Sequence, residues 1–145
     1  MFTIGFTGTR SGLTEDQYEI LGNLIRSYAD LHNNVFGVHG DCVGADASFD
    51  ALCKVHKVPT AIRPCTFSSL RAYCKGEILA EPKRPMQRNR EIVADADVLF
   101  GCPPNKEPIK KGSGTWATIR MAKKAGIKHY IIYPDGDLDV VEEKE

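Results

Sequence analysis

The sequence has no excess of charge of either sign, since nineteen lysine and arginine residues balance nineteen aspartate and glutamate residues. No global field therefore draws the protein to nucleic acid or to an acidic membrane, and any charge-driven binding is local. Long hydrophobic runs are missing as well, and the start MFTIGFTG has neither the basic residues nor the long apolar stretch of a signal peptide. We therefore expect a cytoplasmic protein with no membrane partner.

Several site motifs are absent. The five cysteines are odd in number, contain no Cys-x-x-Cys pair and have no histidine at zinc-finger spacing, so we expect reduced thiols and predict no metal site. Gly5, Gly8 and Gly12 do not fit the Gly-x-Gly-x-x-Gly fingerprint, and no P-loop occurs. These absences disfavour a nicotinamide dehydrogenase and an ATPase, and we predict no cofactor.

Apolar periodicity alternates between the strand and helix types along the 145 residues. A capping box of Thr14 and Gln17 begins the first predicted helix, and Gly126 ends the last. The pattern predicts strands at 2–6, 35–39, 58–64, 97–104 and 128–134, and helices at 14–31, 45–57, 86–96 and 115–126. Residues 65–85 are the least regular part, and long excursions of this kind are often functional.

This alternation predicts a single α/β domain, a doubly wound Rossmann-like fold with a mostly parallel five-stranded sheet and helices on both faces. Right-handed crossovers allow the strand order 3-2-1-4-5. We expect the domain to span residues 1–135. The acidic segment 136–145 is expected to be a solvated C-terminal tail.

Three glycine-bearing turns should project from the same edge of this sheet: TGTR at 7–10, HGDCVGAD at 39–46 and GSGT at 112–115. Glycines allow a close approach of backbone to ligand, and the amides that begin a helix favour an anion. Each turn alone also fits an ordinary capped loop. Their convergence at one edge favours a ligand site, with Lys110 and Lys111 beside the third turn.

The segments FTGTR, HGDCVGAD, RNREIVADADVLFGCPP and GSGTWATIRMAKKAGIKHYIIYP resemble the SLOG superfamily, the Rossmann-like group that contains the DNA-processing protein DprA and the Lonely-guy phosphoribohydrolases. The small stand-alone branch related to YpsA and YspA is the most similar in these motifs. The resemblance covers nearly the whole chain and is weakest in residues 65–85. It implies a pocket for a nucleotide or a phosphorylated nucleotide derivative. The implied ligand-binding residues are Thr7, Gly8, Thr9, Arg10, Gly40, Asp41, Gly44, Ala45, Asp46, Arg88, Asn89, Gly112, Ser113, Gly114 and Thr115.

One departure from that family bears on activity. Lonely-guy enzymes carry two glutamates just after their glycine-rich turn, and Ala117 and Thr118 stand there in this chain. The turn therefore has no obvious general acid or nucleophile. Asp41 or Asp46 can substitute as the catalytic carboxylate, or can simply hold the ribose hydroxyls of a bound ligand.

Three functions follow from these observations. The first is a binding module for a nucleotide-derived small molecule, acting as a sensor, carrier or scavenger. The alternative is an N-glycoside hydrolase or transferase, resembling a phosphoribohydrolase, that acts on a nucleoside monophosphate. The third is DNA processing of the DprA kind, supported by seven basic residues against one glutamate in residues 106–128. The neutral chain and the lack of interleaved aromatic residues disfavour a nucleic-acid partner.

Two further points stay open in the sequence. Arg88 and Arg90 in the middle helix can face an anion or merely solvent. The resemblance implies a homo-oligomer, a dimer or higher. Tyr73, Ile78 and Leu79 offer apolar material for either a symmetric contact or a lid.

Overall fold

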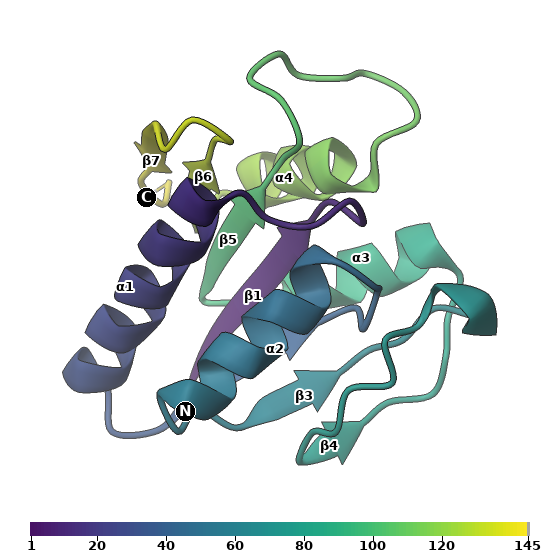
Figure 1. Cartoon of the computed structure of the whole chain (residues 1–145), viewed down its shortest axis with the longest axis horizontal. Helices are drawn as coiled ribbons and strands as arrows, with labels where there is room; N and C mark the ends of the chain where they lie inside the picture. The colour runs from purple at the N-terminus through teal and green to yellow at the C-terminus, as the bar shows by residue number, and fades with distance from the viewer. Residues whose placement is uncertain (145) are drawn as a thin grey trace.

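Seven strands form one sheet in the computed structural model, which describes residues 1–144 (Figure 1). The strands are β1 (Phe2–Gly8), β2 (Val35–His39), β3 (Thr60–Ile62), β4 (Ile78–Leu79), β5 (Val98–Cys102), β6 (Lys128–Ile132) and β7 (Leu138–Val141). The α-helices are α1 (Glu15–Leu31), α2 (Ala45–Val55), α3 (Pro85–Asp95) and α4 (Gly114–Ala125), and η1 (Ser68–Leu70) is a short 3-10 helix.

The central strands run β3-β2-β1-β5-β6 and are all parallel, which confirms the Rossmann-like α/β fold and the predicted order of these five. The predicted number of strands is wrong, because the sheet has seven. The two-residue strand β4 joins the β3 edge in parallel, and β7 joins the β6 edge antiparallel. Both additions are held by backbone pairing; β4 has only two residues, and β7 lies within an acidic segment, so neither was predicted as a strand.

The segment expected to be a solvated tail therefore contains β7. Gly136, with φ of +91°, lies in the turn between β6 and β7, and its N–H donates to the Tyr133 carbonyl oxygen at 3.0 Å. Leu138 and Val140 are exposed, so the solvated character holds for side chains but not for the backbone.

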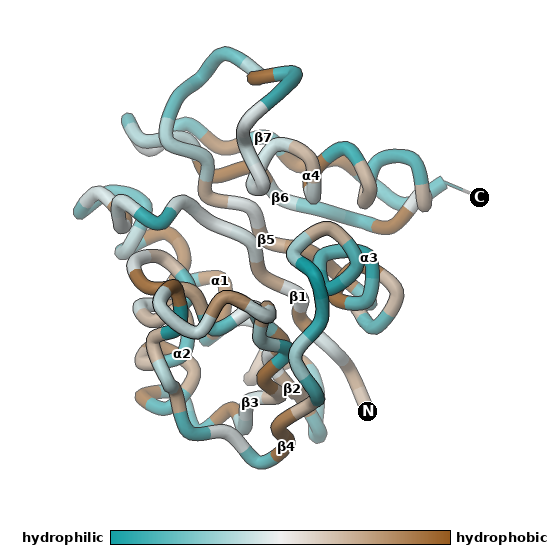
Figure 2. The backbone as a smooth tube through the Cα atoms, turned by 90° about the vertical axis from the view of Figure 1, so that its right-hand side faces the viewer, coloured by the Kyte–Doolittle hydropathy of each residue, from teal (hydrophilic) through white to brown (hydrophobic). Residues whose placement is uncertain are grey.

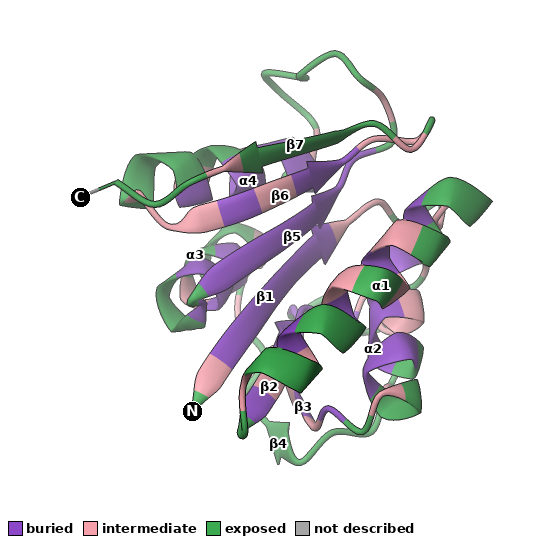
Figure 3. Ribbon diagram, turned by 90° about the vertical axis from the view of Figure 1, so that its left-hand side faces the viewer, coloured by how far each residue is buried: buried purple, intermediate pink, exposed green. Residues whose placement is uncertain are grey.

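The helices cover both faces of the sheet. Side chains of α1 and α2 pack with Ile4, Phe6 and Phe100 in the larger core, while Ile92 of α3 and Ala122 of α4 pack with Leu99 on the opposite face. Strands β1 and β5 are accordingly buried on both sides (Figure 3). Figure 2 shows that the loop before α4 is mostly hydrophilic, whereas β4 at the edge of the sheet is hydrophobic. No helix within residues 1–144 combines the length and apolarity that a membrane span requires.

Strands β1 and β5 are parallel neighbours, so the loops that follow them begin side by side. Thr7 lies opposite Gly101 and Gly8 opposite Cys102 in the parallel register, at the point where the strand order reverses.

The predicted capping box also forms, with the Gln17 N–H donating to Thr14 Oγ1 at 3.1 Å and the Thr14 N–H donating to the Gln17 side chain at 3.0 Å. Helices α2, α3 and α4 all begin at this carboxyl edge, so their amino ends surround one space.

Candidate functional site

A cavity of about 770 Å³ lies at this edge of the sheet. It brings together twelve of the residues that the sequence placed in a ligand site: Thr7, Gly8, Thr9, Arg10, Gly40, Asp46, Arg88, Asn89, Gly112, Ser113, Gly114 and Thr115. It does not bring Asp41, Gly44 or Ala45 into its lining. The three glycine-bearing turns therefore do converge, but not every residue in them faces the space.

Arg88 is the most deeply buried cation of the lining, with 6% of its surface exposed. Its Nε donates to Asn89 Oδ1 at 2.8 Å, and its Nη1 donates to the carbonyl oxygens of Gly40 at 2.5 Å and Arg63 at 3.3 Å. Among residues 1–144 no carboxylate lies within ion-pair distance of it. Arg90, the other candidate on α3, is exposed and lies outside the cavity lining.

Gly40 is required by this arginine. A Cβ at position 40 would lie 2.2 Å from Arg88 Nη1, a distance that no real side chain tolerates. Gly44 has φ of +90°, and a Cβ there would lie 2.3 Å from the backbone oxygen of Arg10. Next to it, the Ala45 N–H donates to the Thr9 carbonyl oxygen at 3.0 Å. Gly40 and Gly44 thus admit the protein's own atoms, whereas the sequence suggested that they admit a ligand.

Asp46 lies in the first turn of α2 and lines the cavity, although it is almost fully buried. Its Oδ2 accepts the Cys42 N–H at 3.1 Å, and its Oδ1 has no hydrogen-bond partner within residues 1–144. Burial raises the pKa of this carboxyl group, against the opposing effects of the Cys42 hydrogen bond and of the nearby Arg88 charge. The neutral, proton-bearing form is therefore favoured more than in an ordinary aspartate.

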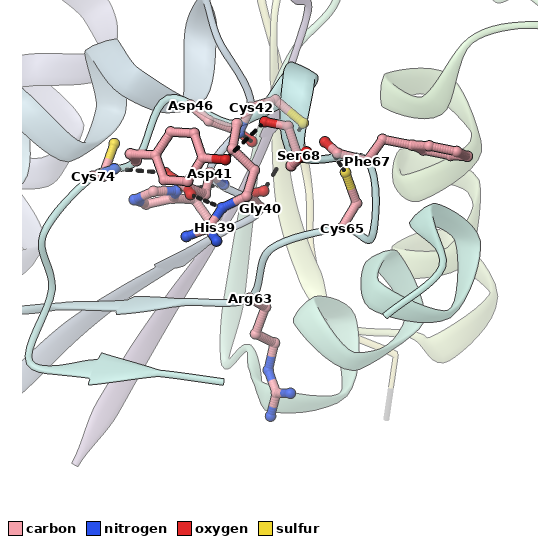
Figure 4. A network of polar contacts seen from close by, with 12 residues as sticks. His39, Gly40, Asp41, Cys42, Asp46, Arg63, Cys65, Phe67, Ser68 and Cys74 are labelled. Carbon is pink, nitrogen blue, oxygen red and sulfur yellow. Dashed lines mark hydrogen bonds and ion pairs between the residues drawn. The ribbon is translucent and has the colours of Figure 1, made fainter. Parts of the chain in front are cut away.

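Asp41 points elsewhere. It is fully buried in a left-handed backbone conformation, with φ of +60°. One carboxylate oxygen accepts from Arg71 Nε and the other from the Cys74 N–H, both at 2.8 Å (Figure 4). Asp41 thus holds the segment between β3 and α3 against the end of β2. Its carboxylate does not line the cavity.

The start of α4 supplies donors for an anion. Ser113 Oγ accepts the Trp116 N–H at 3.2 Å and caps the helix, whereas the N–H groups of Gly114 and Thr115 begin the helix and have no partner inside it. Arg120 lines the same region and donates to the carbonyl oxygens of Ile109 at 2.8 Å and Lys110 at 3.3 Å. The helix start, with its positive dipole end, therefore faces the cavity beside several cations.

Three solved structures resemble this chain in fold. A molybdenum cofactor binding protein from Rippkaea orientalis superposes with a TM-score of 0.67 at 19% identity, over 91% of this chain and 76% of that one. The molybdenum cofactor carrier protein of Chlamydomonas reinhardtii gives 0.64 at 17%, over 90% and 76%. DNA processing protein A from Streptococcus pneumoniae gives 0.63 at 16%, over 90% of this chain and 50% of that one. The chain therefore shares the fold of these three proteins. No family model and no curated protein matches the sequence.

Part of the lining of this cavity was not predicted from the sequence. The missed lining residues are Phe6, Cys42, Cys65, Phe67, Leu70, Pro85, Met86, Ile92, Pro104, Ile109, Lys110, Ala117 and Arg120. Several belong to the irregular excursion, whose length was the available signal, or to the loop before α4, where Lys110 had been noted. Burial raises the pKa of the Cys42 thiol, so this cysteine is not an activated nucleophile.

One buried cluster has the donors for a metal but not the right protonation. Ligand atoms of His39, Asp50 and Cys74 all lie within 4.8 Å of one another. His39 Nδ1 accepts the Asp41 N–H at 2.9 Å, so its Nε2 bears the proton and donates to Asp50 Oδ1 at 2.8 Å. Burial, followed by the nearby Asp50 charge, raises the pKa of the Cys74 thiol to about 12. A satisfied hydrogen-bond network fits these contacts better than a metal site does.

Proposed function

We propose that this protein binds a nucleotide or a nucleotide-derived phosphorylated small molecule in the cavity, as a sensor, carrier or scavenger. The observation that carries the proposal is Arg88, a buried cation that lines the cavity without a carboxylate partner among residues 1–144. A buried charge is costly unless it is paired, and the groups that hold Arg88 in place are neutral. An anionic ligand would supply the missing charge.

The rest of the lining supports a phosphate in particular. Arg10, Lys110 and Arg120 add positive charge, and Asp46 is the carboxylate that lines the cavity. The glycine-rich turn and the first amides of α4 are groups of the kind that hold a phosphate. A volume of about 770 Å³ accommodates a ligand of nucleotide size.

The comparisons add support for a carrier. Two proteins of similar fold are described as a molybdenum cofactor binding protein and a molybdenum cofactor carrier protein. A carrier uses the same cavity features as a sensor or scavenger, namely anion donors without a complete set of catalytic groups. The proteins of DprA type, one of them described by its single-stranded DNA binding mode, keep DNA processing as the third candidate.

N-glycoside cleavage is the second candidate, because burial raises the pKa of Asp46 and so favours the protonated form that could act as general acid toward a departing base. Such hydrolysis ordinarily uses a pair of carboxyl groups, and Asp46 is the one in the lining. At the position of a family glutamate, Thr118 is fully buried and donates to the Gly114 carbonyl oxygen at 2.8 Å. Because the Thr118 hydroxyl is used in this hydrogen bond within α4, it does not supply a second catalytic group. Ligand binding without turnover is therefore favoured.

The first test is native mass spectrometry of the purified protein, followed by chemical analysis of any small molecule that heating releases. Ribose 5-phosphate and the four ribonucleoside monophosphates are then titrated by calorimetry into the wild type, Arg88→Met and Arg90→Met. Arg88→Met should weaken binding roughly 10- to 100-fold, since a charge-assisted hydrogen bond is lost. Arg90→Met, the same change two residues away on the exposed side of α3, should bind as the wild type does.

Two results would contradict the proposal. One is an empty purified protein that binds none of these phosphates. The other is release of free base from a nucleoside monophosphate on prolonged incubation, abolished in Asp46→Asn, which would establish the hydrolase instead. Thermal unfolding of both arginine variants checks that a loss of binding is not a loss of fold.

A further inference from the structure

The cavity has an apolar wall that the anion-binding groups do not use. Phe67 and Leu70 from the excursion, with Met86 at the start of α3, contribute its side chains. In Figure 1 residues 67–70 and the start of α4 lie on either side of the start of α3. The apolar wall and the phosphate-binding start of α4 line the same cavity.

Phe67 is the notable member of this wall, because 56% of its surface is exposed. Its ring points away from the buried polar network of His39, Asp41 and Asp46 (Figure 4). Within residues 1–144 no other aromatic ring stacks on it. An aromatic face that lines a cavity without a partner is suited to a flat ring of a ligand.

The backbone around Phe67 is held firmly. Its carbonyl oxygen accepts the Leu70 N–H at 3.0 Å, and the Leu70 carbonyl oxygen accepts the Val43 N–H at 3.0 Å. On the other side, the Thr66 N–H donates to the Lys83 carbonyl oxygen at 3.0 Å. The wall is thus fastened to the β2 turn and to the chain entering α3, so little conformational entropy is lost when a ring packs against it.

We infer that Phe67, with Leu70 and Met86, forms the seat for the flat heteroaromatic ring of the ligand, while the start of α4 holds its phosphate. This inference rests on the proposed function and adds a ligand class to it: a phosphorylated compound with a planar ring, in preference to a plain sugar phosphate. The excursion that is weakest in family resemblance would then be the part that determines ligand preference.

The test compares ribose 5-phosphate with the adenine, guanine, cytosine and uracil ribonucleoside monophosphates by calorimetry. At least one nucleotide should bind roughly 5- to 100-fold more tightly than ribose 5-phosphate, the range expected for one base stacked on one aromatic side chain. Phe67→Ala should remove that preference and leave ribose 5-phosphate binding within twofold. Phe67→Leu, which keeps apolar contact but has no π face, should lose most of it, and Phe67→Trp should keep it.

Tyr18→Ala serves as the matched control, because Tyr18 is an exposed aromatic residue of α1 outside the cavity lining. If ribose 5-phosphate binds and no nucleotide binds more tightly, or if Phe67→Ala leaves the preference intact, the ring seat is refuted while the anion site stands. If ribose 5-phosphate and the nucleotides all fail to bind, the proposed function fails and this inference fails with it.

Discussion

Asp46 keeps one carboxylate oxygen buried and without a partner among residues 1–144, while its other oxygen accepts the Cys42 N–H. Burial raises its pKa, so folding opposes ionisation of this group. Its destabilising contribution is absent below the unfolded pKa of about 4 and is fully present above the raised folded value. Asp46→Asn should therefore increase the free energy of unfolding at pH 8 by about 0.5–2 kcal/mol.

Urea unfolding of the wild type and Asp46→Asn between pH 4 and pH 8 measures this effect. The difference between the two proteins should shrink as the pH falls toward 4, because the aspartate is then protonated in both the folded and the unfolded state. Asp30→Asn on the exposed side of α1 is the matched control and should change little at any pH. A less stable Asp46→Asn at pH 8 would mean that the charged form is satisfied in the fold.

The sequence could indicate which residue types gather at the site, but not the direction of each side chain. The family resemblance implied Arg88 as a ligand-binding residue, whereas the residue types alone left Arg88 and Arg90 equivalent, and burial in the structure separates them. Asp41 and Asp46 were also equivalent in HGDCVGAD. They differ because the left-handed backbone at Asp41 turns its carboxylate toward Arg71, a contact between residues 30 positions apart that local pattern cannot reveal.

The position of the segment between β3 and α3 is stabilised more by hydrogen bonds to Asp41 than by apolar packing of η1, since none of the residues in η1 is buried. Asp41 receives the Arg71 side chain and the N–H groups of Cys74 and, through its carbonyl oxygen, Ala72. Asp41→Asn removes the charge that pairs with Arg71 and leaves a poorer acceptor. We expect a loss of about 2–4 kcal/mol in the free energy of unfolding.

Hydrogen exchange resolves where that loss acts. In Asp41→Asn the amides of Ala72 and Cys74 should exchange faster than those of β1, because the excursion opens before the sheet does. The matched control is Asp95→Asn, which removes a more exposed ion pair with Arg63 and should cost less than about 1 kcal/mol. Uniform loss of protection across the sheet in Asp41→Asn would show that Asp41 supports the global core and not this segment.

The sequence described the regular elements well and the edges of the sheet poorly. The capping box of α1 and the central strand order follow from local patterns and from the handedness of crossovers, and both are confirmed. Strand β4 was missed because two residues are too few for a recognisable pattern, and β7 was missed because its short apolar stretch lies within an acidic segment. Backbone pairing alone defines them, and it depends on where the preceding strand ends.

The edge strand β4 is a candidate contact surface between two copies of the chain. Ile78 and Leu79 are 55% and 63% exposed, and Tyr73 nearby is exposed as well, while none of the three lines the cavity. Their place at the free edge favours the symmetric contact over the lid, since unpaired strand backbone and apolar side chains suit a second copy of the same strand. We expect a homodimer in solution.

Light scattering coupled to size-exclusion chromatography tests this expectation. The double variant Ile78→Lys with Leu79→Lys should elute as a monomer, because like charges would then face one another across a two-fold axis. Val140→Lys at the opposite edge, on β7, is the control and should remain dimeric. A wild type that is monomeric at high concentration would refute the dimer, and a dimer that survives the double lysine variant would place the contact away from β4. Ligand titration of the monomeric variant then shows whether the cavity binds ligand without a second copy of the chain.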